Sequence, residues 1–273
     1  MGLRIQNNVE AFNTHRQLTT TATAASKSME KLSSGYRINR AADDAAGLAI
    51  SEKMRGQIGG LAQAQRNAQD GISLVQTAEG ALTEVHSMLQ RIRDLKVQSL
   101  NDTLASEDKD AIAAEVSQLG TEITAISSDT AFNGIKLLNS ASGTLNFQVG
   151  ANDSETITAS QIDLAGGSAV SKVLTASDAS SLSSVTVSDI DAAIKDVSTA
   201  RAGFGAVQNR LEHRLNNLAT YQENLTASES RIRDVDMAEE MTKFTKLNIL
   251  QQAGTSMLAQ ANQAPQSVLS LLR

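Results

Sequence analysis

Apolar residues recur at alternating three- and four-residue steps along two long segments, and this pattern constrains the fold more than any other feature. One seam covers residues 61–95, with polar intrusions at Gln65 and Glu79, and the other covers residues 190–232. Such spacing is typical of amphipathic helices that pack along one another over several heptads. Because Pro265 is the only proline, no proline ring interrupts either seam. We therefore expect a mainly α fold, with long antiparallel helices in a coiled-coil-like rod.

These helices are longer than those of ordinary globular domains. The first extends over about 43–100, roughly 58 residues, or about 85 Å at about 1.5 Å of rise per residue. A third, shorter helix is expected at about 107–127, with its apolar residues on one face. The apolar positions of the second seam are Ile190, Ile194, Val197, Phe204, Val207, Leu211, Leu215, Leu218, Tyr221, Leu225 and Ile232.

Helical periodicity is lost between about residues 140 and 188, a stretch rich in Ser and Thr. Leu145, Phe147 and Val149 alternate with polar residues, a turn sequence follows at 150–153, and residues 156–158 read as a second strand. This pattern predicts a β-hairpin. We expect the rest of the region, within about 130–185, to be a surface excursion from the helical rod.

The two ends of the chain carry thinner apolar stripes that predict a second helix pair, a separate coiled coil. Polar runs interrupt both stripes, at Thr19–Thr21 and at Gly254–Ser256, so an isolated pair would bury little apolar surface. We expect these ends to be loose in the monomer and to fold against neighbouring molecules. The candidate assembly residues are Ile5, Val9, Phe12, Met29, Leu32, Met241, Phe244, Leu247, Leu250, Met257, Leu258, Val268 and Leu271.

Composition and charge argue against several classes of protein. The chain has no cysteine, which excludes disulfides and thiolate metal sites, and no apolar run of 18 residues that would span a membrane. Its formal net charge of −6 argues against nucleic-acid binding, which needs clustered cations. Residues 1–8 contain no continuous apolar stretch, so we expect no cleaved secretory signal.

Searches for catalytic and metal-binding patterns find little. His15, His86 and His213 lie on three different expected helices, none with a second histidine three or four residues away. The acidic pairs at 43–44 and 234–236 have the residue types of general acid–base catalysis. They also lie where long helices begin or end, and there the helix dipole stabilises carboxylates, which we favour. We expect no enzymatic activity, no cofactor and no metal.

Residues 90–98 are charged on both sides of the first seam and admit two interpretations. They are either a solvated helix flank with intrahelical ion pairs, or a recognition patch with Arg91 as its anchor. The residues alone do not decide between the two.

Four motifs give the chain a resemblance to a known family. They are KLSSGYRINRAADDAAGLAI at 31–50, FNGIKLL at 132–138, SRIRDVDMAEEM at 230–241 and QAPQSVLSLLR at 263–273. The chain resembles bacterial flagellin, the filament subunit, in a short form without large outer domains. The resemblance covers all of the sequence except about residues 140–185.

The resemblance implies a domain plan and a set of partners. Residues 1–42 and 236–273 would form the inner helical domain of the filament, and residues 43–235 the rod domain outside it. The chain would leave the cell through the flagellar type III channel and become part of the extracellular filament. Its partners would be further copies of itself, hook-associated and cap proteins, and an export chaperone at the C-terminal segment, with neither nucleic acid nor membrane among them.

The resemblance also favours the recognition patch. In flagellins sensed by Toll-like receptor 5, the receptor reads a segment similar to residues 90–98. Gln90, Arg91 and Leu95 lie in that segment, and Glu115 matches an acid on the following helix. Asp94 is a shortened acid and Lys96 places a cation where a small residue is usual, and both differences would affect receptor affinity.

Two other roles remain open at this point. A flagellin-like junction protein between hook and filament would share the terminal motifs. An enzyme inserted in the variable region is the other alternative, but only about 45 residues are present there, too few for an independent catalytic domain.

Overall fold

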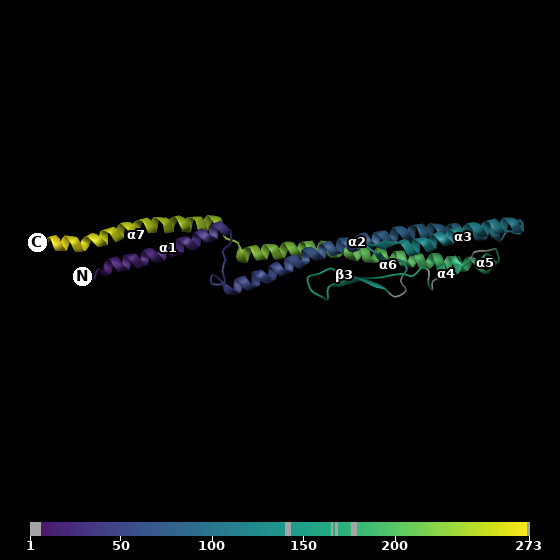
Figure 1. Cartoon of the computed structure of the whole chain (residues 1–273), viewed down its shortest axis with the longest axis horizontal. Helices are drawn as coiled ribbons and strands as arrows, with labels where there is room; N and C mark the ends of the chain where they lie inside the picture. Colours follow the sequence, from purple (N-terminus) through teal and green to yellow (C-terminus); the bar gives the residue numbers. More distant parts are fainter. Residues whose placement is uncertain (1–6, 140–142, 165, 167–168, 176–178, 272–273) are drawn as a thin grey trace. The chain divides into compact units, whose positions relative to one another are not determined.

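The computed structural model describes residues 7–139, 143–164, 166, 169–175 and 179–271 (Figure 1). The chain is mainly helical, as the sequence predicts. The long helices are α1 (Val9–Ser34), α2 (Ala45–Ser99), α3 (Ser106–Asp129), α6 (Val187–Arg233) and α7 (Met237–Leu271). None of the described helices is both long and apolar enough to cross a membrane.

The contacts divide the chain into two compact units. The terminal unit comprises Met1–Gly56 and Asn224–Arg273, and the central unit comprises Gln57–Glu223. Helices α2 and α6 each run from one unit into the other. The domain boundaries expected from the sequence, at 42/43 and 235/236, differ from these unit limits and stay a prediction.

The core of the central unit is built from the two predicted seams and α3. The fully buried side chains include Leu82, Leu89 and Ile92 on α2, Ile190 and Leu211 on α6, and Ile123 on α3. Each such aliphatic side chain contributes about 1.5–3 kcal/mol when it is removed from water. The heptad-like seams and the third helix are therefore confirmed.

Polar residues within the seams meet each other across the helix pair. Gln65 Nε2 donates to Gln222 Oε1 at 2.8 Å, and Arg201 Nη2 lies 3.8 Å from Glu79 Oε1. Residue numbers rise along α2 as they fall along α6, so the two helices are antiparallel. Tyr221, expected in the seam, is 46% exposed, and that assignment is wrong. Gln222 takes the position that faces α2, which turns the preceding side chain about 100° away from the partner helix.

Two β-hairpins accompany the helices. Strands β3 (Thr144–Gln148) and β4 (Thr156–Ser160) pair antiparallel with Phe147 opposite Ile157, which confirms the predicted hairpin. A smaller hairpin joins β1 (Ala131–Phe132) and β2 (Ile135–Lys136) through Asn133 and Gly134, whose φ angles are 48° and 81°. Asn-Gly is favoured where both turn residues need positive φ, so the sequence did carry a signal for this second hairpin.

The segment after β4 is more than a surface excursion, so that expectation is wrong. It contains two short helices, α4 (Ala169–Leu174) and α5 (Ala179–Ser184), both in contact with α3. Val170, Val173, Leu182 and Val185 are buried in the core of the central unit. The helices are about two turns or less, too short to produce a recognisable helical period among the surrounding Ser and Thr residues.

In the terminal unit α1 and α7 lie antiparallel (Figure 1). Asn8 caps α1 by accepting a hydrogen bond from the Ala11 amide at 3.1 Å, and Gly35, with φ 75°, ends the helix. The connections between helices also pair: the Arg37 amide donates to the Arg233 carbonyl at 2.6 Å, and the Val235 amide to the Gly35 carbonyl at 3.1 Å. The predicted pairing of the terminal helices is confirmed.

Candidate assembly and recognition surfaces

The interface between α1 and α7 is made mainly from small side chains. Ala25 and Ser28 are buried on α1, as is Ala261 on α7. A β-carbon placed on Gly254 would lie 3.2 Å from Leu18 Cδ1, so the helices approach closely there. Gly254 thus leaves room in the interface for the side chain of Leu18.

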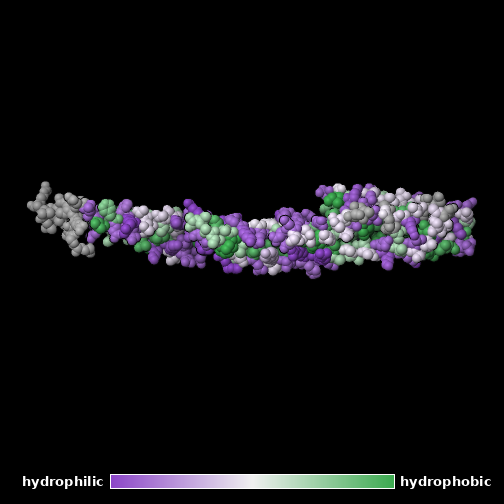
Figure 2. All heavy atoms as spheres, turned by 90° about the horizontal axis from the view of Figure 1, so that it is seen from below, coloured by the Kyte–Doolittle hydropathy of each residue, from purple (hydrophilic) through white to green (hydrophobic). Residues whose placement is uncertain are grey.

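Of the ten predicted assembly residues whose side chains the structure describes, six are exposed on the surface of the terminal unit. Phe12 is 71% exposed, Val9 65% and Met257 59%, and Met29, Met241 and Leu250 are also exposed. Leu32, Phe244, Leu247 and Leu258 are half-buried. Ile5 and the side chains of Val268 and Leu271 lie outside the described residues. Figure 2 shows apolar atoms at the surface of the α1–α7 part, separated by hydrophilic ones.

Two polar contacts set the register of this helix pair. Asn8 Nδ2 donates to the Ala261 carbonyl at 2.7 Å, and Ser28 Oγ donates to the carboxylate of Glu240, which is buried. Lys243 Nζ lies 3.7 Å from the other oxygen of Glu240. Sliding either helix would leave these groups unpaired in the interface. The sequence analysis missed these residues, although polar residues inside an apolar stripe were a visible signal.

Three of the four carboxylates considered for catalysis accept from backbone amides, and the fourth, Asp234, accepts from the Ser230 hydroxyl at 2.6 Å. Asp43 Oδ2 accepts from the amides of Arg40 and Asn39, and these bonds hold its pKa below the usual value for aspartate. Asp44 accepts from the Gly47 amide at 2.9 Å in the first turn of α2. Asp236 accepts from the Ala238 amide at 2.9 Å at the start of α7. The interpretation as helix-terminal carboxylates is confirmed for Asp44 and Asp236, whereas Asp43 closes the turn of residues 39–43 that precedes α2.

Arg91 of α2 and Glu115 of α3 form a surface ion pair in the central unit. Arg91 Nη2 and Nε donate to Glu115 Oε1 at 2.8 and 3.0 Å, and both side chains are about half exposed. Gln90 is exposed beside them and contacts His86 on its own helix. Three of the four predicted recognition residues thus lie on one surface built by two helices.

Leu95 and Lys96 lie beneath that surface. Leu95 is 2% exposed and belongs to the core, so it supports the patch from below. Lys96 is 4% exposed, and its Nζ donates to the Leu182 carbonyl at 2.7 Å, at the end of α5. Burial lowers the pKa of Lys96. The Lys96 cation is therefore directed away from solvent, whereas Asp94 is exposed.

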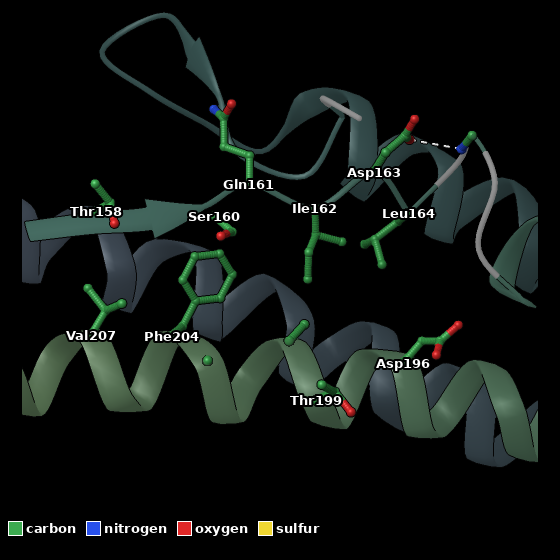
Figure 3. Close-up of a pocket in the computed structure, with 13 residues that line it drawn as sticks. Thr158, Ser160, Gln161, Ile162, Asp163, Leu164, Asp196, Thr199, Phe204 and Val207 are labelled. Carbon is green, nitrogen blue, oxygen red and sulfur yellow. Dashed lines mark hydrogen bonds between the residues drawn. The ribbon is translucent and has the colours of Figure 1, made fainter. Parts of the chain in front are cut away.

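A groove of about 580 Å³ lies between α6 and the segment after β4 (Figure 3). Ile162 and Leu164 point toward α6, where Phe204 and Val207 line the opposite wall. Its carboxylates are not free: Asp163 accepts from the Gly166 amide at 2.8 Å, and Asp196 from the Ala169 amide at 3.3 Å. Within the described ranges no group of three or more His, Cys, Asp or Glu side chains could hold a metal ion.

Comparison with known proteins places the chain in a family. Residues 5–142 match the bacterial flagellin N-terminal helical region, and residues 187–272 match the bacterial flagellin C-terminal helical region. The chain belongs to the bacterial flagellin family. It is 55% identical to a flagellin of Halalkalibacterium halodurans, over 98% of this chain and 99% of that one. It is 50% identical to a flagellin of Bacillus subtilis, over 99% of this chain and all of that one.

Solved structures agree with this assignment. The crystal structure of a Bacillus cereus flagellin is 34% identical in sequence and superposes with a TM-score of 0.50, covering 56% of this chain and 88% of that one. The part that neither flagellin region matches, residues 143–186, contains β3, β4, α4 and α5. That is the part of the fold that sequence reasoning described least well.

Proposed function

We propose that this flagellin is the bulk subunit of an extracellular filament and polymerises through the apolar residues of its terminal unit. The exposed Phe12 carries the proposal, together with the exposed Val9 on α1 and the exposed Leu250 and Met257 on α7. Large exposed apolar side chains are typical of surfaces that another molecule covers. Subunits joined through unlike surfaces, by a rotation that does not close, form an open helical polymer.

The magnitude of the apolar term supports assembly. Covering these four side chains, which are 47–71% exposed, would contribute roughly 4–7 kcal/mol before the cost of immobilising a subunit is subtracted. The polar register contacts of Ser28 and Asn8 would hold the two stripes in a fixed relation, so that neighbouring copies meet a defined surface.

Truncation tests the assembly proposal. A chain without residues 1–40 and 236–273 should stay soluble and helical, because the core of the central unit is made from other residues. It should not polymerise under salt conditions in which the full chain forms filaments. Filaments of the truncated chain in electron micrographs would contradict the proposal.

The proposal includes the route and partners of such a subunit. Export through the flagellar type III channel would require an unfolded chain. A chaperone holding the C-terminal segment, together with cap and hook-associated proteins, would complete the assembly pathway. Co-purification of the chain with a chaperone, lost when residues 236–273 are deleted, tests the chaperone part.

The alternative role is that of a junction protein between hook and filament, present in few copies. Near-full-length relatives at 55% and 50% identity are both flagellins, which favours the bulk subunit. Adding monomer to purified filament seeds separates the roles. A bulk subunit should extend the seeds in proportion to the amount added, whereas a junction protein should stop growth after one layer.

We further propose that the surface of Gln90, Arg91 and Glu115 is a ligand of Toll-like receptor 5. The exposed ion pair of Arg91 and Glu115 supports this, since it joins two helices into one polar surface above the buried Leu95. In a receptor reporter assay, Arg91→Ala should reduce the response at least about tenfold, because arginine is enriched in interface hot spots. Arg66→Ala, at an exposed arginine of the same helix, is the matched control, and equal responses from the two variants would contradict the proposal.

A further inference from the structure

The central unit has a second concave surface, which includes neither the assembly residues nor the recognition patch. It lies between α6 and the hairpin turn that leads into β4, and its volume is about 640 Å³. We call it the Arg210 groove. Its polar walls are Arg210, His213 and Asn217 on α6 and Ser154, Glu155 and Thr156 on the hairpin.

One wall of the groove is a face of α6, and the other is the hairpin, which side-chain contacts hold in place. Arg210, His213 and Asn217 follow the i, i+3, i+7 spacing that places side chains on one helix face. The neighbouring Arg214 fastens the hairpin: its Nε donates to the Val149 carbonyl at 3.0 Å, and its Nη2 lies 3.4 Å from Glu155 Oε1. The distance between the two walls is therefore set by protein contacts.

Arg214 holds the hairpin against α6, whereas Arg210 makes no such contact within the described residues. Within the described part of the chain, Arg210 has neither an ion pair nor a side-chain hydrogen bond, and it is exposed at the groove. Its guanidinium offers five N–H donors in a planar arrangement that matches a carboxylate. The side chains of His213 and Asn217, also on α6, likewise form no hydrogen bond within the described residues.

Arg210 is an unpaired cation in a unit with a negative net charge. Residues 57–223 contain 11 Lys or Arg against 20 Asp or Glu, a formal net charge of −9. Most of the basic side chains near the core are paired, for example Arg93 with Asp191 at 2.7 Å. An unpaired arginine in a concave site within an acidic unit attracts an anion locally while the rest of the surface repels it.

The other walls of the groove indicate what kind of anion fits. The hydroxyls of Ser154 and Thr156 and the amide of Asn217 can exchange hydrogen bonds with ligand hydroxyls. Glu155, already paired with Arg214, can accept from a further hydroxyl. Val149 and Ile157, both almost fully buried, close the bottom of the groove.

We propose that the Arg210 groove binds an acidic saccharide, with a sugar carboxylate on Arg210 and ring hydroxyls on Asn217, Ser154 and Thr156. This goes beyond the filament proposal, because all of the groove lies within the central unit and needs no second copy of the chain.

Calorimetric titration of the full-length monomer tests this with three probes: a tetramer of galacturonic acid, a neutral tetramer of galactose, and inorganic phosphate. The wild type should bind the acidic tetramer, and Arg210→Gln should weaken binding at least about tenfold, because a charge-assisted hydrogen bond is lost. Asn217→Ala should weaken it less. The neutral tetramer and phosphate should bind much more weakly or not at all.

Arg66→Gln is the matched control, since Arg66 is an exposed arginine whose side chain contacts Gln63 on its own helix. This variant should bind the acidic tetramer as the wild type does. The proposal is overturned if the wild type does not bind the acidic tetramer, or if both arginine variants lose the same affinity. It is also overturned if phosphate binds as tightly as the tetramer, which would make the groove a simple anion site.

Discussion

The ring of Phe147 on β3 lies directly over Gly71 on α2. A β-carbon at Gly71 would come within 3.0 Å of Phe147 Cδ1 and 3.3 Å of Leu211 Cδ1, so any side chain at this position would displace its neighbours. The absence of a side chain at Gly71 lets the hairpin and α6 approach α2 at the same level. This contact also holds one end of the strand that leads to the Arg210 groove.

Gly71→Leu should lower the free energy of unfolding by about 1–3 kcal/mol, because overpacking forces side chains and backbone to shift. Urea denaturation followed by circular dichroism measures the effect. Gly80→Ala is the control: it lies in the same helix with nothing within 4 Å of an added β-carbon, and should stabilise the helix by about 1 kcal/mol. Equal stability of the two variants would show that the Phe147 contact does not constrain the fold.

The buried Lys96 predicts a pH dependence of stability. Burial lowers its pKa in the folded chain, so the unfolded chain binds more protons between that value and about 10.4, the ordinary lysine pKa. Stability from this group therefore rises with pH as pH rises through that window. Lys96→Met should remove this rise, which urea denaturation at a series of alkaline pH values measures.

The control for Lys96 is Lys195→Met, at an exposed lysine of α6. This variant should keep the alkaline rise seen in the wild type. If Lys96→Met keeps the rise as well, the Lys96 ammonium is not desolvated in solution and the contact with the Leu182 carbonyl does not persist.

The buried carboxylate of Glu240 should contribute to the stability of the terminal helix pair. Glu240→Ala removes the carboxylate partner of the Ser28 hydroxyl, leaves it only the more distant carbonyl of residue 240 at 3.5 Å, and should weaken the pairing of α1 and α7 by about 1–3 kcal/mol. Amide hydrogen exchange in α1 of the monomer should become faster. Glu239→Ala, at the exposed neighbour in the same helical turn, loses the same charge near the helix N-terminus and should change exchange much less.

Sequence reasoning succeeded where burial follows a period. Leu82, Val85, Leu89 and Ile92 are fully buried because alternating steps of three and four keep one helix face toward its partners. The same period already implied that Leu95 is buried, although the resemblance placed it among the receptor-contacting residues. The helical period therefore predicts the burial of Leu95 correctly, whereas the motif resemblance says nothing about its burial.

What could not be predicted depends on tertiary contacts. Ser28 and Glu240 are 212 positions apart, and only the register of the helix pair brings them together. The same holds for Lys96 and the Leu182 carbonyl, since α5 gives no periodic signal of its own. The Arg210 groove joins residues about 60 positions apart whose spacing in the sequence shows no motif.

Phe12 gives the sharpest test of the terminal unit as an assembly surface. Phe12→Ser should change the unfolding free energy of the monomer by less than about 0.5 kcal/mol, because its side chain is 71% exposed and outside the α1–α7 interface. The same change should raise the critical concentration for polymerisation roughly tenfold or more, since burying a phenylalanine contributes about 1.5–3 kcal/mol. Sedimentation of salt-assembled polymer measures the critical concentration.

Asn13→Ser, at the adjacent exposed residue of α1, controls for the loss of a larger side chain. Because monomer stability and polymer affinity are measured separately, an unchanged critical concentration would show that neighbouring subunits do not cover Phe12, whatever happens to the fold.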